Sequence, residues 1–223
     1  MRLVILTAIG VGGATVIGSL MGFLFGRASN KFINAIFFVA SALMLFAAIG
    51  GLILPAYEYK DKRVGVTLFM LVGAICLFLT DKLLPIIQKK GSEYSGNHKK
   101  IARAWLLILA IGIHNFPEGI AAGVGFGSGD SGKALLIAGG IALQNIPEGM
   151  IVVFPMLESG MGRKKTFFLS LLTGCMEVLG TLIGYFAVNI ESGILPYILA
   201  FAGGTMLYVI FVEAREHISL KKL

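Results

Sequence analysis

The chain has 223 residues, of which 57% are hydrophobic and only 14% are charged, and it contains 30 glycines. Soluble domains carry about 25% charged residues, so this composition excludes a soluble enzyme, a nucleic-acid-binding protein and a disordered chain. The formal net charge of +7 comes from lysines and arginines that lie between apolar stretches, where membrane topology explains them. We therefore predict an integral membrane protein.

Seven apolar stretches of roughly 20 residues follow one another along the chain, and each is about as long as a helix that crosses a bilayer. None alternates strictly between apolar and polar residues as a barrel strand does. The predicted fold class is all-α, a polytopic transmembrane helix bundle that forms a single membrane domain over residues 1–223. Cys76 and Cys175 lie within spans, where we expect buried packing thiols. The predicted spans are 3–25, 33–55, 64–87, 101–126, 133–157, 165–189 and 193–214.

The distribution of basic residues predicts the orientation of the bundle. An odd number of spans places the two ends of the chain on opposite sides of the membrane. Five of the 19 lysines and arginines fall on the N-terminal side, thirteen fall on the other side, and Lys82 lies inside a span. Because cytoplasmic loops carry the basic excess, we expect the N-terminus outside and a cytoplasmic loop at 88–100. We also predict a location in the plasma (cell inner) membrane.

Two neighbouring spans carry a polar motif near their centres. Residues 114–119 read His-Asn-Phe-Pro-Glu-Gly, and residues 144–149 read Gln-Asn-Ile-Pro-Glu-Gly. The two copies lie at similar distances from the loop that connects their spans, so they are expected at nearly the same depth. Positions i and i+4 share a helix face, so each motif directs its first residue and its glutamate to one side. The proline of each motif removes a backbone hydrogen bond, which membrane helices tolerate where they line a cavity.

Ionisable side chains inside a membrane are costly and are functional candidates by default. The carboxylates of Glu118, Glu148 and the mid-span Glu177 would repel one another in an empty, low-dielectric site, and a divalent cation would remove that repulsion. With the imidazole of His114, their oxygens favour zinc, iron(II) or manganese(II) over copper(I), which prefers sulfur. Alternatively, His114 and Glu118 form a hydrogen-bonded pair within one helix, and the neighbouring amide side chains make interhelical hydrogen bonds.

The paired motifs resemble those of the ZIP (Zrt/Irt-like) family of divalent-metal transporters, and the resemblance covers nearly the whole chain. It implies a metal site, sometimes binuclear, halfway along a transport path that carries zinc, or iron, manganese or cadmium, toward the cytoplasm. Met44, in the second span, is a candidate ligand by this resemblance, and core filling is the alternative explanation for it. The metal ligands that the resemblance implies are His114, Asn115, Glu118, Gln144, Asn145 and Glu148, together with Glu177 and Met44.

The chain departs from the family pattern at three places. Many members have a histidine where Gln144 stands and an acid where Asn145 stands, so one of two adjacent metal positions should be weak. The charge of the site supports this expectation. Glu118, Glu148 and Glu177 carry three negative charges, so one bound dication leaves the site with a net charge of −1 and two leave it with +1. His98 stands alone in a loop where members often have many histidines. The family usually has eight spans, whereas seven are predicted here.

Two acids lie toward the predicted cytoplasmic face, Asp81 in the third span and Glu213 in the seventh. With Glu216 and His217 they are candidates for an exit relay that hands the metal to the cytosol. Local ion pairs with neighbouring basic residues are the alternative explanation.

The predicted function is therefore metal transport, not enzymatic catalysis, and no cofactor is expected. The alternatives are a metal-selective channel, a non-transporting metal-binding receptor and, more remotely, an intramembrane protease. The Gly-x-Gly-Asp sequence at 127–130 is found in such proteases, but their second aspartate must lie at comparable depth, and Asp81 belongs near the opposite face. The expected partners are divalent metal ions and the lipid bilayer, with no nucleic acid, and a homodimer remains open.

Overall fold

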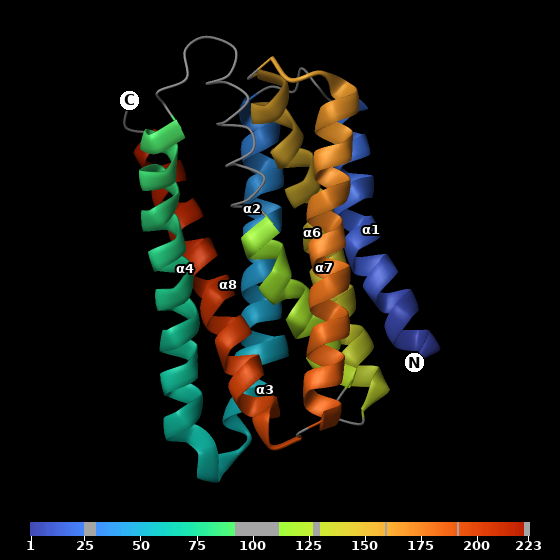
Figure 1. Cartoon of the computed structure of the whole chain (residues 1–223), viewed down its shortest axis with the longest axis vertical. Helices are drawn as coiled ribbons and strands as arrows, with labels where there is room; N and C mark the ends of the chain where they lie inside the picture. Colours follow the sequence, from blue (N-terminus) through green and yellow to red (C-terminus); the bar gives the residue numbers. More distant parts are fainter. Residues whose placement is uncertain (25–29, 92–111, 127–129, 159, 191, 221–223) are drawn as a thin grey trace.

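The computed structural model describes residues 1–24, 30–91, 112–126, 130–158, 160–190 and 192–220, and over these ranges it is helical and contains no strand (Figure 1). The long helices are α1 (Arg2–Leu24), α2 (Asn30–Phe46), α4 (Arg63–Gly91), α6 (Ser131–Glu158), α7 (Arg163–Ile190) and α8 (Leu195–Leu220). Residues 112–126 form a further helical segment. The shorter elements are η1 (Ala47–Ile53), α3 (Leu54–Tyr57), η2 (Lys60–Lys62) and η3 (Ser192–Ile194). The predicted all-α fold is confirmed.

Six of the described helical stretches are long and apolar enough to cross a membrane, and each coincides with a predicted span to within a few residues. They are Arg2–Leu24, Asn34–Tyr57, Lys60–Leu83, Ser131–Phe154, Arg163–Val188 and Leu195–Val212. Of the predicted span 101–126, residues 112–126 are described and helical, and residues 101–111 lie outside the described residues. Helix α4 continues to Gly91, so the predicted loop at 88–100 begins with helix, and its residues 92–100 are not described.

The helices form two groups that meet along α2. Helix α1 packs against both α6 and α7, whereas α4 packs mainly against α8. Helix α2 contacts α6, and the η1 segment that follows it contacts α8. Figure 1 shows this arrangement, with α4 and α8 on one side, α1 and α7 on the other, and α2 and α6 between them. The start of α1 and the end of α8 lie at opposite ends of the bundle (Figure 1), as an odd number of crossings requires.

The second span contains a π-helical turn that the sequence analysis did not predict. Residues Ala47–Ile53 form η1, which contains the glycine pair Gly50 and Gly51. π-Helical turns within α-helices are rare and occur mostly as single wide turns. Here the turn joins α2 to α3 within one continuous membrane-spanning stretch.

The prediction that the two cysteines are buried was wrong. Cys76 and Cys175 are both free thiols, and both are exposed on the outer surface of the bundle. Cys175 lies one helical turn from Leu171 and from Leu179, which are 40% and 51% exposed. These positions share one face of α7, so the thiol belongs to the apolar outer face that a membrane protein turns toward lipid.

Close backbone contacts between helices depend on glycine. A Cβ atom built at Gly18 of α1 would overlap the carbonyl oxygen of Ile146 in α6, and one built at Gly12 would overlap the carbonyl oxygen of Gly174 in α7. Membrane helices approach this closely only where small residues line the interface. Helices α1, α6 and α7 are therefore packed backbone against backbone.

This packing predicts opposite effects for two alanine substitutions on the same helix. Gly18→Ala forces a methyl group against the backbone of α6, and we expect it to lower the free energy of unfolding by about 1–3 kcal/mol. Gly13→Ala is the matched control, because no atom lies within 4 Å of a Cβ at that position. It should be neutral or slightly stabilising, since alanine is the better helix former. Thermal unfolding in detergent or nanodiscs measures both, and equal melting temperatures for the two variants would contradict this packing.

Candidate metal site

A direct hydrogen bond joins the two polar motifs. The side-chain nitrogen Nε2 of Gln144 in α6 donates to Oε1 of Glu118 in the helical segment 112–126, at 2.7 Å. Both side chains are buried, with 0% and 2% of their surface exposed. The two motifs therefore face each other inside the bundle, as expected for two copies at similar depth. The remaining motif glutamate, Glu148, is half-buried.

Glu177 is the centre of a second buried network. Its Oε1 accepts hydrogen bonds from Oγ1 of Thr15, at 2.6 Å, and from Nδ2 of Asn115. Its Oε2 accepts a hydrogen bond from Nδ2 of Asn145, at 2.6 Å. All four side chains are at least 98% buried. Donors from three helices thus converge on one carboxylate of a fourth, which is how a charged group is satisfied in the membrane interior.

The amide groups of both motifs leave one oxygen each without a hydrogen bond. Oδ1 of Asn115, Oε1 of Gln144 and Oδ1 of Asn145 are buried and have no hydrogen-bond partner. A buried polar atom without a partner is unusual and calls for an explanation. The interhelical hydrogen bonds considered as an alternative are therefore present, but the nitrogens make them. The oxygens remain available to a ligand.

His114 lies toward α4. Its Nε2 is 3.8 Å from Oδ1 of Asp81, with the two side chains 21% and 27% exposed. That distance suits an ion pair but is too long for a hydrogen bond, and the buried Nε2 makes none. The contact connects the helical segment 112–126, which carries His114, with α4, which carries Asp81. The side chains of the other predicted relay residues, Glu213, Glu216 and His217, lie outside the described residues.

Met44 occupies an apolar environment. It is 2% exposed and belongs to the main hydrophobic cluster of the bundle, which also includes Ala48 of η1 and Ile141 of α6. This position fits core filling, and its role as a metal ligand stays a prediction.

The described residues contain no group of three or more histidine, cysteine, aspartate or glutamate side chains close enough together to hold a metal ion. The reason is visible in the contacts: His114 lies toward Asp81, and both oxygens of Glu177 accept hydrogen bonds from neutral donors. A metal held here would therefore need amide oxygens besides carboxylates. Zinc and other divalent ions accept mixed nitrogen and oxygen ligands, so the residues present fit such a cargo.

Two polar residues of α1, which no motif in the sequence contains, support this region. Thr15 donates to Glu177, and Ser19 donates to the carbonyl oxygens of Thr15 and Gly149, at 3.0 and 3.2 Å. The glycine at the end of each motif explains why the neighbouring helices α1 and α7 come so close to the motif helices. A Cβ at Gly149 would overlap the carbonyl oxygen of Thr15, and a Cβ at Gly119 would overlap that of Glu177. The glycine that ends each motif is the signal that could have pointed to them.

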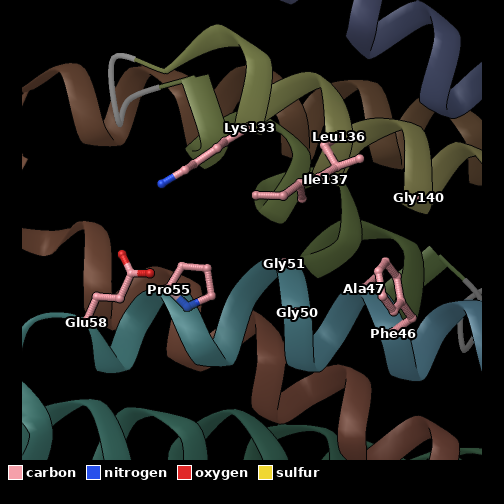
Figure 2. Close-up of a pocket in the computed structure, with 10 residues that line it drawn as sticks. All are labelled: Phe46, Ala47, Gly50, Gly51, Pro55, Glu58, Lys133, Leu136, Ile137 and Gly140. Carbon is pink, nitrogen blue, oxygen red and sulfur yellow. The ribbon is translucent and has the colours of Figure 1, made fainter.

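A separate pocket lies between the second span and α6. It has a volume of about 260 Å³ and is lined mainly by apolar and glycine residues of η1, α3 and α6. Lys133 and Glu58 extend toward it from opposite walls (Figure 2). None of the predicted metal ligands is among its ten lining residues, so it is distinct from the motif region.

Comparison with known proteins gives consistent matches. The family model of the ZIP zinc transporters matches residues 88–216. The chain is 44% identical over 145 residues to the zinc transporter GufA of Myxococcus xanthus, a match that covers 65% of this chain and 57% of that protein. It is 33% identical over 219 residues to the zinc transporter ZupT of Chlorobium chlorochromatii, which covers 89% of this chain and 81% of that protein.

The extent of these matches differs between relatives. The zinc transporter ZIPB of Bordetella bronchiseptica is 30% identical over 211 residues, a match that covers 90% of this chain and 67% of that protein. By contrast, the chain spans little more than half the length of GufA and 34% of the zinc transporter ZIP11 of Xenopus tropicalis.

The hydrogen bonds of Asn145 predict a stability effect that does not depend on any metal. Asn145→Leu keeps the approximate size of the side chain but removes the donor to Glu177 and to the carbonyl oxygen of Val11. We expect the free energy of unfolding to fall by about 1–3 kcal/mol, because a buried carboxylate loses a hydrogen bond. Leu143→Ala, at a neighbouring position that is 58% exposed, is the control and should have a smaller effect. Unfolding measured in the presence of a chelator checks both, and an unchanged Asn145→Leu variant would show that this donor is dispensable.

Proposed function

The chain belongs to the ZIP zinc transporter family, and on this premise we propose that it carries divalent transition-metal ions, zinc first, across the membrane toward the cytoplasm. Membership in a family of transporters agrees with the prediction that the protein is not an enzyme. Iron, manganese and cadmium are the other cargoes that the ligand chemistry admits. The proposed direction is the one that the resemblance to the family implies, and the basic excess indicates which face of the bundle is cytoplasmic.

One observation above all supports this proposal. Three amide oxygens from the two motifs, on Asn115, Gln144 and Asn145, are buried in the bundle without a hydrogen bond. Together with Glu118, whose carboxylate accepts a hydrogen bond from Gln144, they supply oxygen donors that a desolvated divalent ion would satisfy. Gln144 and Asn145 lie on the stretch Ser131–Phe154, which is long and apolar enough to cross a membrane, and Asn115 and Glu118 lie on the helical segment 112–126.

We assign the cargo site to residues of both motifs. Glu118 and Glu148 would supply the charged oxygens and His114 a neutral imidazole nitrogen, which requires its side chain to turn away from Asp81. Neutral oxygens would come from the three motif amides. Asp81 would then receive the metal on the cytoplasmic side, because its carboxylate is the nearest acid to His114 among the contacts described.

The transport proposal predicts a loss of flux in Glu148→Ala. In proteoliposomes that contain unlabelled zinc, we expect the wild type to accumulate radioactive zinc by counterflow and Glu148→Ala to accumulate at least about tenfold less, since a charged ligand is lost. Asp61→Ala removes an exposed carboxylate of η2 and serves as the control.

The same experiment separates the alternatives. A receptor would bind zinc, as measured by titration calorimetry in detergent, but would show no flux. A channel would conduct zinc without stimulation by zinc on the opposite side. A protein whose zinc flux is indifferent to Glu148→Ala would not use the proposed site.

The amide content of the site predicts how many ions it holds. With Gln144 and Asn145 in place of an imidazole and an acid, we expect about one zinc ion per chain at saturation, measured by elemental analysis of the purified protein. The variant Gln144→His adds a nitrogen ligand and leaves the hydrogen bond from Asn145 to Glu177 in place, so it should raise this ratio toward two. Two ions in the wild type, or no gain in Gln144→His, would contradict this expectation.

A further inference from the structure

We propose that Glu177 and Thr15 act as positioning residues that hold the amide oxygens of Asn115 and Asn145 toward the metal, and that Glu177 itself stays outside the coordination sphere. This inference rests on the proposed function, which it deepens. It assigns a role to Thr15, which no motif contains, and it changes the role expected for Glu177 from ligand to support.

The direction of each amide follows from what Glu177 can offer. A carboxylate has acceptor oxygens only, so each asparagine must turn its Nδ2 toward Glu177 and its Oδ1 away from it. For Asn145 a second acceptor enforces the same choice, because Nδ2 also donates to the carbonyl oxygen of Val11 at 3.3 Å. The two Oδ1 atoms are the ones that remain buried without a partner. Reversing either amide would place an oxygen against an oxygen.

Thr15 completes the support from α1. Its hydroxyl group donates to Oε1 of Glu177, the same oxygen that accepts from Asn115. Its backbone is held in turn, because the carbonyl oxygen accepts from Ser19 and lies against Gly149. Thr15 therefore contacts the network through Glu177 and acts on the metal only at a distance.

The arrangement also strengthens the ligands. A negative charge hydrogen-bonded to the nitrogen of an amide polarises the group and makes its oxygen a better donor to a cation. Partners behind metal ligands raise ligand basicity and fix orientation in this way, and their loss typically costs about 10- to 100-fold in metal affinity. Glu177 can thus contribute its charge to the site without binding the metal directly.

The first test uses threonine variants of nearly equal size. Thr15→Val removes the hydroxyl group, and we expect the zinc dissociation constant, measured by competition calorimetry in detergent, to rise about tenfold. Thr15→Ser keeps the hydroxyl group and should stay close to the wild type. Thr173→Val is the matched control, because this buried threonine of α7 donates to the carbonyl oxygen of Ser170 in its own helix. Equal affinity of Thr15→Val and Thr173→Val would overturn the role of Thr15.

The second test reverses one amide. Glu177→Gln keeps the size of the side chain but replaces one carboxylate oxygen with an NH₂ group. Because both oxygens of Glu177 accept hydrogen bonds, this NH₂ group must face one of the donors. If its oxygen serves both Thr15 and Asn115, its nitrogen meets Nδ2 of Asn145, so that amide must turn its own oxygen away from the metal. We expect zinc affinity to fall about 10- to 100-fold. Adding Asn145→Asp should restore most of it, because one oxygen then accepts from the new amide and the other faces the metal.

A zinc-bound structure of the wild type would show directly, without any variant, whether Glu177 binds the metal. We expect Glu177 to keep its three hydrogen bonds, with both oxygens outside bonding distance of the metal. A Glu177 oxygen at roughly 2.0–2.2 Å from zinc would overturn the inference while leaving the proposed function intact. A wild type that binds no zinc, with Glu118→Ala indistinguishable from it, would overturn the proposed function and this inference together.

Discussion

The structure depends on satisfying one buried carboxylate. Glu177 is fully inaccessible, and its two oxygens accept hydrogen bonds from Thr15, Asn115 and Asn145. In a membrane interior a carboxylate without such donors would cost several kcal/mol. The three donors belong to three different helices, so satisfying this group and assembling the bundle are one requirement. The close glycine contacts at the ends of both motifs allow the donors to reach it.

Much of this arrangement could be predicted from the sequence. The lengths of the apolar stretches predicted the described spans, because a bilayer of fixed thickness selects helices of about 20 residues. The repeated motif predicted that its two copies lie at nearly the same depth, since helix rise and a shared loop fix that depth, and the hydrogen bond between Gln144 and Glu118 agrees with this. The association of Glu177 with the motif residues also followed from its lone position in an apolar span.

Other features depend on packing, which a single sequence does not encode locally. Thr15 looks like any threonine of an apolar helix, where the hydroxyl group usually bonds its own backbone, and only the docked position of α7 reveals its partner. The contact of His114 with Asp81 joins two helix groups whose relative placement no motif specifies. The cysteines were misplaced for the same reason: which face of a uniformly apolar helix turns outward is decided by its neighbours.

The order of the network along the chain has a consequence for biosynthesis. All three donors precede their acceptor: α1 and both motif helices are synthesised before α7. A ribosome that delivers Glu177 to the translocon therefore delivers it to a membrane where hydroxyl and amide partners are already present. Glu177 would hinder the insertion of an isolated α7. In this bundle its insertion depends on the earlier helices, because it is accommodated only when they are correctly docked.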